Sequence, residues 1–99
     1  MKLIKSAIVG VKFNPGAHDR LLETTPGSPV ELRRDPANKH DANAIECRIG
    51  GLLCGFIPGP QAAGLARDMD VGIAVRAISR GFAKIEIEVD APGEEESAA

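Results

Sequence analysis

The stretch RDPANKHDANAIEC, residues 34–47, gathers carboxylates, carboxamides and an imidazole within a few positions of one another. Such side chains can act as general acids and bases, ligate a metal, or form hydrogen bonds with a bound molecule. They are also common in ordinary turns, because Asn and Asp side chains bond to nearby backbone groups. An active site, a metal site, a rigid binding loop and a simple turn are therefore the four interpretations to weigh.

Catalytic chemistry finds little support in the sequence. The pairs His40-Asp41 and His18-Asp19 each place an imidazole beside a carboxylate. Adjacent residues on an extended backbone point to opposite faces, so neither pair is a natural dyad. No serine lies in a nucleophile-elbow motif, and both cysteines fall where small core residues belong. The sequence therefore predicts that the protein is not an enzyme.

Metal binding and phosphate binding are disfavoured for similar reasons. The residues His18, His40, Asp35 and Asp41 match no recurring spacing of metal ligands. Neither Gly50-Gly51 nor the Pro58-Gly59-Pro60 segment resembles a Gly-rich phosphate loop. The two prolines also remove N–H donors that the start of a helix would otherwise offer to an anion. We expect no metal and no small-molecule cofactor.

The composition is that of one globular domain with an uneven charge. The chain has 99 residues, of which 43% are hydrophobic and 26% charged, with three Phe and no Trp or Tyr. Its formal net charge is -2, but Asp90, Glu94, Glu95 and Glu96 account for four of the 14 acidic residues. The remaining ten acids against 12 Lys and Arg leave the body at +2. We therefore expect a domain over residues 1–90 and an acidic disordered tail over residues 91–99.

The compartment is expected to be the cytoplasm. No apolar run reaches the roughly 18 residues that would cross a membrane. The N-terminal segment MKLIKSAIVGVKF is interrupted by Lys5 and Lys12, so it does not read as a signal peptide. Two cysteines do not make a disulfide framework in such a setting, and both are expected to be free.

The first half of the chain reads as strands separated by loops. Residues 6–13 (SAIVGVKF) are rich in β-branched residues and are predicted to form the first strand. Residues 14–29 are predicted to form a long loop with a short helical turn around Asp19 to Glu23. The next predicted strand is Val30 to Arg34, with Val30 and Leu32 pointing inward.

A hairpin is predicted next. Gly50-Gly51 separates the strands 44–49 and 52–57, and both glycines suit the positive φ angles of a two-residue turn. Counting outward from this turn, the predicted cross-strand pairs are Ile49 with Leu52, Cys47 with Cys54, and Ile45 with Phe56. Both cysteines are expected to be buried free thiols.

The rest of the chain predicts a helix and a second hairpin. From Pro60 onward, Ala62, Leu65, Ala66 and Met69 recur at helical spacing, and the helix should end near Gly72. Residues 73–78 and 82–89 are predicted strands around a turn at residues 79–81. The fold class is therefore mainly β (α+β): a small six-stranded antiparallel barrel, OB-like or SH3-like, with one or two short helices.

The polar stretch also resembles a family signature. Residues 30–45 (VELRRDPANKHDANAI) are similar to the central motif of the HIRAN domain family. The segment Gly55-Phe56-Ile57-Pro58 is similar to the hairpin end of that family, and Val9-Gly10-Val11-Lys12-Phe13 to its opening. The resemblance covers residues 6–90. It implies an OB-like barrel that binds DNA and does no catalysis, captures free 3′-hydroxyl ends of single strands, and works beside a helicase or nuclease in DNA repair.

The same resemblance implies roles for six residues. Lys12 would contact the DNA backbone, while Phe13 and His40 would stack on bases, worth about 1–3 kcal/mol per base. Asn38 and Asp41 would line the end pocket, with Asp41 accepting the hydrogen bond of the 3′-hydroxyl, and Phe56 would form the pocket edge.

Other readings remain open for these residues. Phe13 shares the parity of Val9 and Val11, so a core position is an equal alternative. Asp41 and Asn43 are also suited to bonds that only hold the loop. His40, Asn14 and Gly59 stand where the family has aromatic or basic residues, which reduces stacking area and charge. The alternative function is therefore a protein-interaction or regulatory module with a degenerate DNA pocket.

Overall fold

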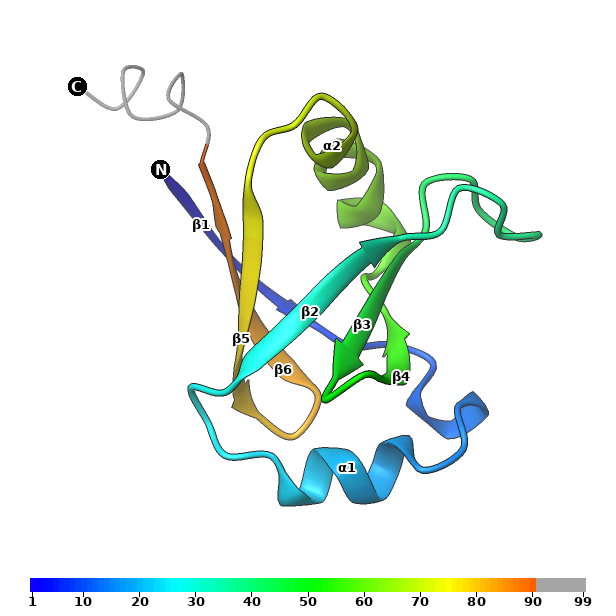
Figure 1. Cartoon of the computed structure of the whole chain (residues 1–99), viewed down its shortest axis with the longest axis vertical. Helices are drawn as coiled ribbons and strands as arrows, with labels where there is room; N and C mark the ends of the chain where they lie inside the picture. Colours follow the sequence, from blue (N-terminus) through cyan, green and yellow to red (C-terminus); the bar gives the residue numbers. More distant parts are fainter. Residues whose placement is uncertain (91–99) are drawn as a thin grey trace.

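The computed structural model describes residues 1–90, so the expected acidic tail at 91–99 lies outside the described residues (Figure 1). Six strands and three helical segments follow one another along this part of the chain. They are β1 (Lys2–Ala7), η1 (Val11–Phe13), α1 (Ala17–Glu23), β2 (Pro29–Arg34), β3 (Ile45–Ile49), β4 (Leu52–Phe56), α2 (Gly59–Asp70), β5 (Val75–Gly81) and β6 (Lys84–Val89).

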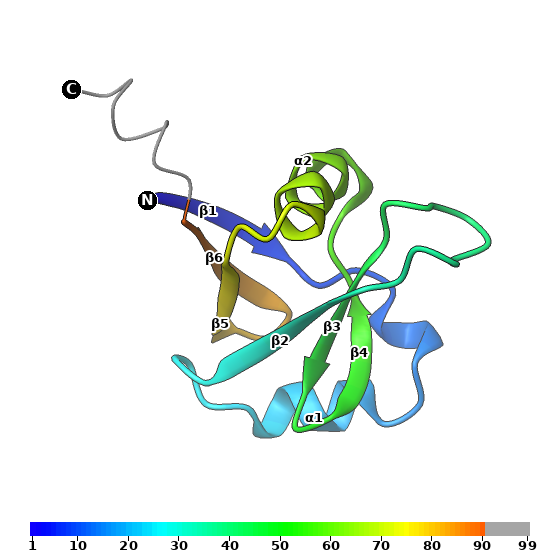
Figure 2. The same ribbon diagram turned by 45° about the horizontal axis from the view of Figure 1, so that its top comes forward.

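All strand pairs are antiparallel, and the order across the sheet is β1-β6-β5-β2-β3-β4. The two outer strands approach each other without forming a continuous ladder. Their link is one isolated bridge, in which the Val9 N–H donates to Phe56 O at 2.9 Å and the Phe56 N–H donates to Val9 O at 3.0 Å. The predicted fold class is confirmed, as an OB-like sheet that stops short of a closed barrel. In two views the helices α1 and α2 lie at opposite ends of this sheet (Figures 1 and 2).

The core forms where the inward face of the curved sheet meets the helices. In β6 the predicted alternation is confirmed, with Ile85, Ile87 and Val89 at most 2% exposed. Ile45 and Cys47 of β3 are fully buried as well. Helix α2 contributes its predicted apolar stripe, namely Ala62, Leu65 and Ala66, with Met69 partly buried.

The predicted first strand was wrong. Residues 6–13 do not form one strand: β1 occupies Lys2–Ala7 and residues 11–13 form the 3-10 turn η1. Gly10 adopts φ 78°, a left-handed conformation that glycine takes without strain and that ends the extended backbone. The predicted loop 14–29 contains more regular structure than expected, since α1 covers Ala17–Glu23 with Ala17 and Leu21 buried.

The first hairpin has its predicted turn and an unpredicted bulge. The pair Ile49–Leu52 is confirmed, but Cys47 lies opposite Gly55 and Phe56 lies opposite Glu46. Cys54 is the extra residue of the bulge, so the expected Cys47–Cys54 and Ile45–Phe56 pairs were wrong. Both thiols are nevertheless free and buried, as predicted.

The second hairpin turns later than predicted. Its turn lies at residues 82–83, where Ala83 adopts φ 54°, instead of at residues 79–81. The register of β5 and β6 shifts between Ser79 and Gly81, so Gly81 belongs to a β-bulge inside the ladder and not to the turn.

Candidate functional site

The turn η1 displays Lys12 and Phe13 at the surface. The Phe13 N–H donates to Gly10 O at 3.0 Å, and the Asn14 side-chain amide donates to the same oxygen at 2.8 Å. These bonds fix the turn, and Phe13 is left 76% exposed. The Lys12 ammonium lies 5.1 Å from the centroid of the Phe13 ring, a cation–π arrangement. Of the two alternatives for Phe13, the core position is therefore wrong.

The loop at residues 35–44 is held by its own polar side chains. Asn38 Oδ1 accepts from the N–H groups of His40 at 2.9 Å and Asp41 at 3.1 Å. The Asn38 amide donates to Asp35 Oδ2 at 3.1 Å, and Asp41 Oδ1 accepts from the Asn43 N–H at 2.8 Å. The prediction of side-chain to backbone bonds is thus confirmed for Asp41, whereas Asn43 takes part through its backbone N–H and the bonds of Asn38 were not predicted. Asn38 shapes the loop, while the His40 side chain is exposed.

Arg34 forms hydrogen bonds at the base of this loop. Its guanidinium donates from Nη1 to Ala44 O at 2.7 Å, from Nη2 to Ala42 O at 3.1 Å, and from Nε to Asp70 Oδ1 at 2.9 Å. Only 16% of the Arg34 side chain is exposed. Sequence reasoning assigned Arg34 no role, although strand alternation places it on the same face as the inward residues Val30 and Leu32.

Phe56 connects the two surface segments. Its backbone bonds to Val9, two residues before η1, and it lies opposite Glu46 of β3, two residues after the loop ends at Ala44. Neighbouring strands are spaced by about 4.8 Å, so η1 and the loop leave the sheet roughly 10 Å apart, one on each side of β4. In both views they project from the same side of the molecule (Figures 1 and 2). Of the six predicted residues, Phe56 therefore lies between Lys12 and Phe13 on one side and Asn38, His40 and Asp41 on the other.

The side chains that this surface exposes are suited to non-covalent contacts with a ligand. Burial raises the pKa of the Cys47 thiol to about 12 and also raises that of Cys54, so neither is a ready nucleophile. Within residues 1–90, no cluster of three or more His, Cys, Asp or Glu side chains could hold a metal ion. An exposed ring, a cation and a carboxylate on a rigid loop can stack on, attract and hydrogen-bond a ligand.

A well-formed groove lies elsewhere. It has a volume of about 780 Å³ and is lined by residues of β1, β5, β6 and the start of α2, with Pro58 the nearest in sequence to Phe56. None of the six predicted site residues lines it. No helix in the described part of the chain is long and apolar enough to cross a membrane.

Comparison with known proteins identifies relatives of this fold. The HIRAN domain family model matches residues 1–88. The crystal structure of the HIRAN domain of human HLTF is 22% identical, with a TM-score of 0.75, and the match covers 88% of this chain and 74% of that one. A Lactobacillus plantarum protein solved by a structural genomics consortium is 22% identical, with a TM-score of 0.74, covering 89% and 93%. At this identity the solved structures show a shared fold. No match is found among curated proteins.

Proposed function

The chain belongs to the HIRAN domain family of DNA-binding modules, and on that premise we propose that it recognises 3′-hydroxyl ends of single-stranded DNA without catalysis. The contacts are assigned to the six residues Lys12, Phe13, Asn38, His40, Asp41 and Phe56. The observation that carries the proposal is that η1, which exposes the Phe13 ring, and the 35–44 loop, which carries the Asp41 carboxylate, project from the same side of the molecule (Figures 1 and 2). A helicase or nuclease that acts on the same end is the proposed partner.

Phe13 supports the proposal through its exposure. A ring that is 76% exposed on a hydrogen-bonded turn contributes little to folding, yet it offers an apolar face to solvent. Bases of any type can stack on such a face, and each stacked base contributes about 1–3 kcal/mol. Lys12 beside the ring adds a positive charge for the neighbouring phosphate.

Asp41 supports the proposal through the bonding of its carboxylate. Oδ1 is engaged by the Asn43 N–H, whereas no hydrogen bond within residues 1–90 occupies Oδ2. An ionised carboxylate accepts a hydrogen bond from a free hydroxyl and repels a terminal phosphate. Because Asn38 already binds the Asp41 N–H, the loop needs no reordering to present this oxygen, which reduces the entropy cost of binding.

The charge supports a contact limited to a few phosphates. Without its four C-terminal acids the body carries +2, which is a weak field for tracking a long strand. We therefore expect recognition of an end, with a shallow dependence of affinity on salt.

The direct test compares a linear 12-nucleotide strand with the same strand closed into a circle, using fluorescence anisotropy of an internal label. The proposal predicts clear binding of the linear strand and little binding of the circle. Equal binding of both would overturn end recognition. Incubation of the linear strand with the protein and Mg²⁺ should leave its length unchanged, and shortening of the strand would contradict the non-catalytic assignment.

A further inference from the structure

The outer edge of β1 presents backbone groups that face away from its partner strand. Ile8 N–H donates to Ala83 O, so the even-numbered residues of this segment bond toward β6. In an antiparallel ladder the backbone N–H and C=O groups of the intervening residues face away from the partner strand. Two odd-numbered residues show this orientation: Lys5 O accepts from Gln61, and Val9 pairs with Phe56. Leu3 and Ala7 share this orientation, so the outward-facing edge spans about five residues, of which Lys5 O is already bonded to Gln61.

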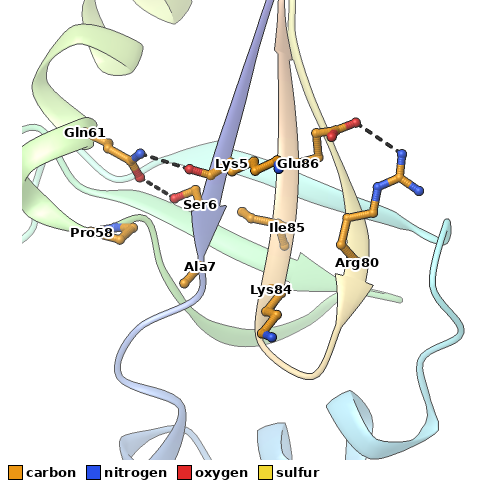
Figure 3. Close-up of a pocket in the computed structure, with 9 residues that line it drawn as sticks. All are labelled: Lys5, Ser6, Ala7, Pro58, Gln61, Arg80, Lys84, Ile85 and Glu86. Atoms are coloured by element: carbon orange, nitrogen blue, oxygen red, sulfur yellow. Dashed lines mark hydrogen bonds and ion pairs between the residues drawn. The ribbon is translucent and has the colours of Figure 1, made fainter.

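The edge lines a gap, here called the fork, where β1 and the segment that leads into α2 diverge. At the Val9–Phe56 bridge the segments are hydrogen-bonded, and beyond it the chain turns away through Pro58 into the helix. Gln61 reaches back across the fork, donating from Nε2 to Lys5 O at 3.2 Å and accepting from the Ser6 hydroxyl through Oε1 (Figure 3). Its amide thus occupies a position that the backbone of an added strand would take.

Space and charge beside the edge favour an acidic occupant. The groove of about 780 Å³ is lined by three cations, Lys5, Arg80 and Lys84, and by one carboxylate, Glu86 (Figure 3). Glu86 is paired with Arg80 at 3.1 Å. Within residues 1–90, neither lysine lies within ion-pair distance of a carboxylate.

The side of the edge that faces α2 carries a second groove of mixed character. Its lining is Lys2, Ile4, Gln61, Gly64, Leu65, Arg67 and Asp68, in which Ile4 and Leu65 are the large apolar side chains. A Cβ placed on Gly64 would meet no atom within 4 Å, so there is room above the helix. Since side chains alternate along a strand, an added segment would place every second residue beside Ile4 and Leu65 and the others beside Lys5 and Lys84.

A peptide fits these features better than DNA or a second copy of the chain. The carbonyl groups of the edge require N–H donors at the spacing of a strand, and a phosphodiester backbone has no donor. A second copy paired edge to edge would bring the Lys5 side chains of both chains close together, which like charge disfavours.

We propose that the β1 edge binds an extended peptide of a partner protein, in which acidic and apolar residues alternate, by adding it as a strand between β1 and α2. This site is separate from the proposed DNA surface, and its test is independent of that function.

The test uses the full-length chain and a blocked seven-residue peptide of alternating glutamate and valine, carrying a fluorescent label. Binding is measured by anisotropy, and backbone amide shifts are followed by NMR. The shifts should concentrate at Leu3, Lys5 and Ala7. Peptides N-methylated at every glutamate or at every valine provide matched controls, because only one set of amides can face β1. One series should lose at least tenfold in affinity and the other should bind like the parent.

Protein variants test the charge and the position of Gln61. The double change Lys5→Glu, Lys84→Glu should weaken peptide binding at least tenfold, while Lys39→Glu, a reversal on the distant loop, should not. Gln61→Ala should raise the affinity several-fold, since it frees Lys5 O. Absence of binding at millimolar peptide, equal binding of both N-methylated series, or an oligothymidine that shifts the same amides as strongly would each overturn the proposal.

Discussion

Arg34 and Asp70 form a two-point ion pair, with Nε 2.9 Å from Oδ1 and Nη2 3.3 Å from Oδ2. Arg34 ends β2 and Asp70 ends α2, so the pair connects the base of the 35–44 loop to the last turn of the helix. The same guanidinium also binds two carbonyl groups of the loop. Arg34 therefore links the position of the polar loop to that of α2.

Replacing Arg34 should loosen the loop. In Arg34→Gln two loop carbonyls lose their charged donor, which we expect to cost roughly 1–3 kcal/mol of stability and to lower affinity for a strand end severalfold. Arg33→Gln is the matched control, because Arg33 is exposed and its side chain pairs with Glu31. Amide hydrogen exchange at His40 and Asp41 should speed up in the first variant alone. Equal exchange in both variants would contradict this role.

Phe13 should matter for binding and not for folding. Because it is 76% exposed, Phe13→Ala should leave the unfolding midpoint nearly unchanged and reduce single-strand affinity by about 1–3 kcal/mol. Phe82, which is 44% exposed and packs its ring against His18 with the ring centroids 5.2 Å apart, offers a control phenylalanine on the β5–β6 turn. A loss of affinity in Phe82→Ala as large as in Phe13→Ala would argue against stacking at η1.

Two glycines should respond to alanine in opposite directions. A Cβ on Gly55 would lie 2.3 Å from Val9 O and 2.6 Å from Ile8 Cγ2, so Gly55→Ala must displace the bridge that joins β1 to β4. We expect a loss of about 1–3 kcal/mol. Gly64, inside α2 with open space around it, should gain about 0.5–1 kcal/mol on the same change. Urea unfolding of both variants measures this, and a neutral Gly55→Ala would show that the close approach is not structurally required.

Cys47 should make the fold sensitive to alkaline pH. Burial raises the pKa of its thiol from 9.0 to about 12. Above pH 9 the unfolded chain releases this proton while the folded chain keeps it, so stability falls as the pH rises from about 9 toward 12. At pH 10 the loss from this group is about 1 kcal/mol. In Cys47→Ala the drop in unfolding free energy between pH 7.5 and pH 10 should be smaller by that amount, and an unchanged drop would contradict the assignment.

The elements set by local patterns were predictable from the sequence. The alternation in β6, the helical spacing in α2 and the Gly50-Gly51 turn each reflect interactions between near neighbours. The errors arose where distant segments determine the structure. The bulge at Cys54 places Gly55 against the backbone of Val9, a contact that hairpin counting cannot foresee.

For the candidate site, only part of the local structure was predictable from the sequence. The loop bond of Asp41 follows from its residue type, while the bonds of Asn38 were not predicted. The exposure of Phe13 depends on Gly10, which ends the extended backbone after β1. The groove beside β1 was not predictable, because Lys5, Gln61 and Lys84 are far apart in the sequence and meet through the order of the strands and the placement of α2.

The measurement that tests the central claim most directly concerns Asp41. Anisotropy titrations at low salt would compare one labelled strand ending in a 3′-hydroxyl with the same strand ending in a 3′-phosphate. The parent chain and Asp41→Ala would be tested, with Asp19→Ala on α1 as a charge-matched control. We predict that the parent and Asp19→Ala prefer the hydroxyl end at least tenfold and that Asp41→Ala loses the preference. Equal affinity of the parent chain for both ends would contradict recognition of the 3′-hydroxyl.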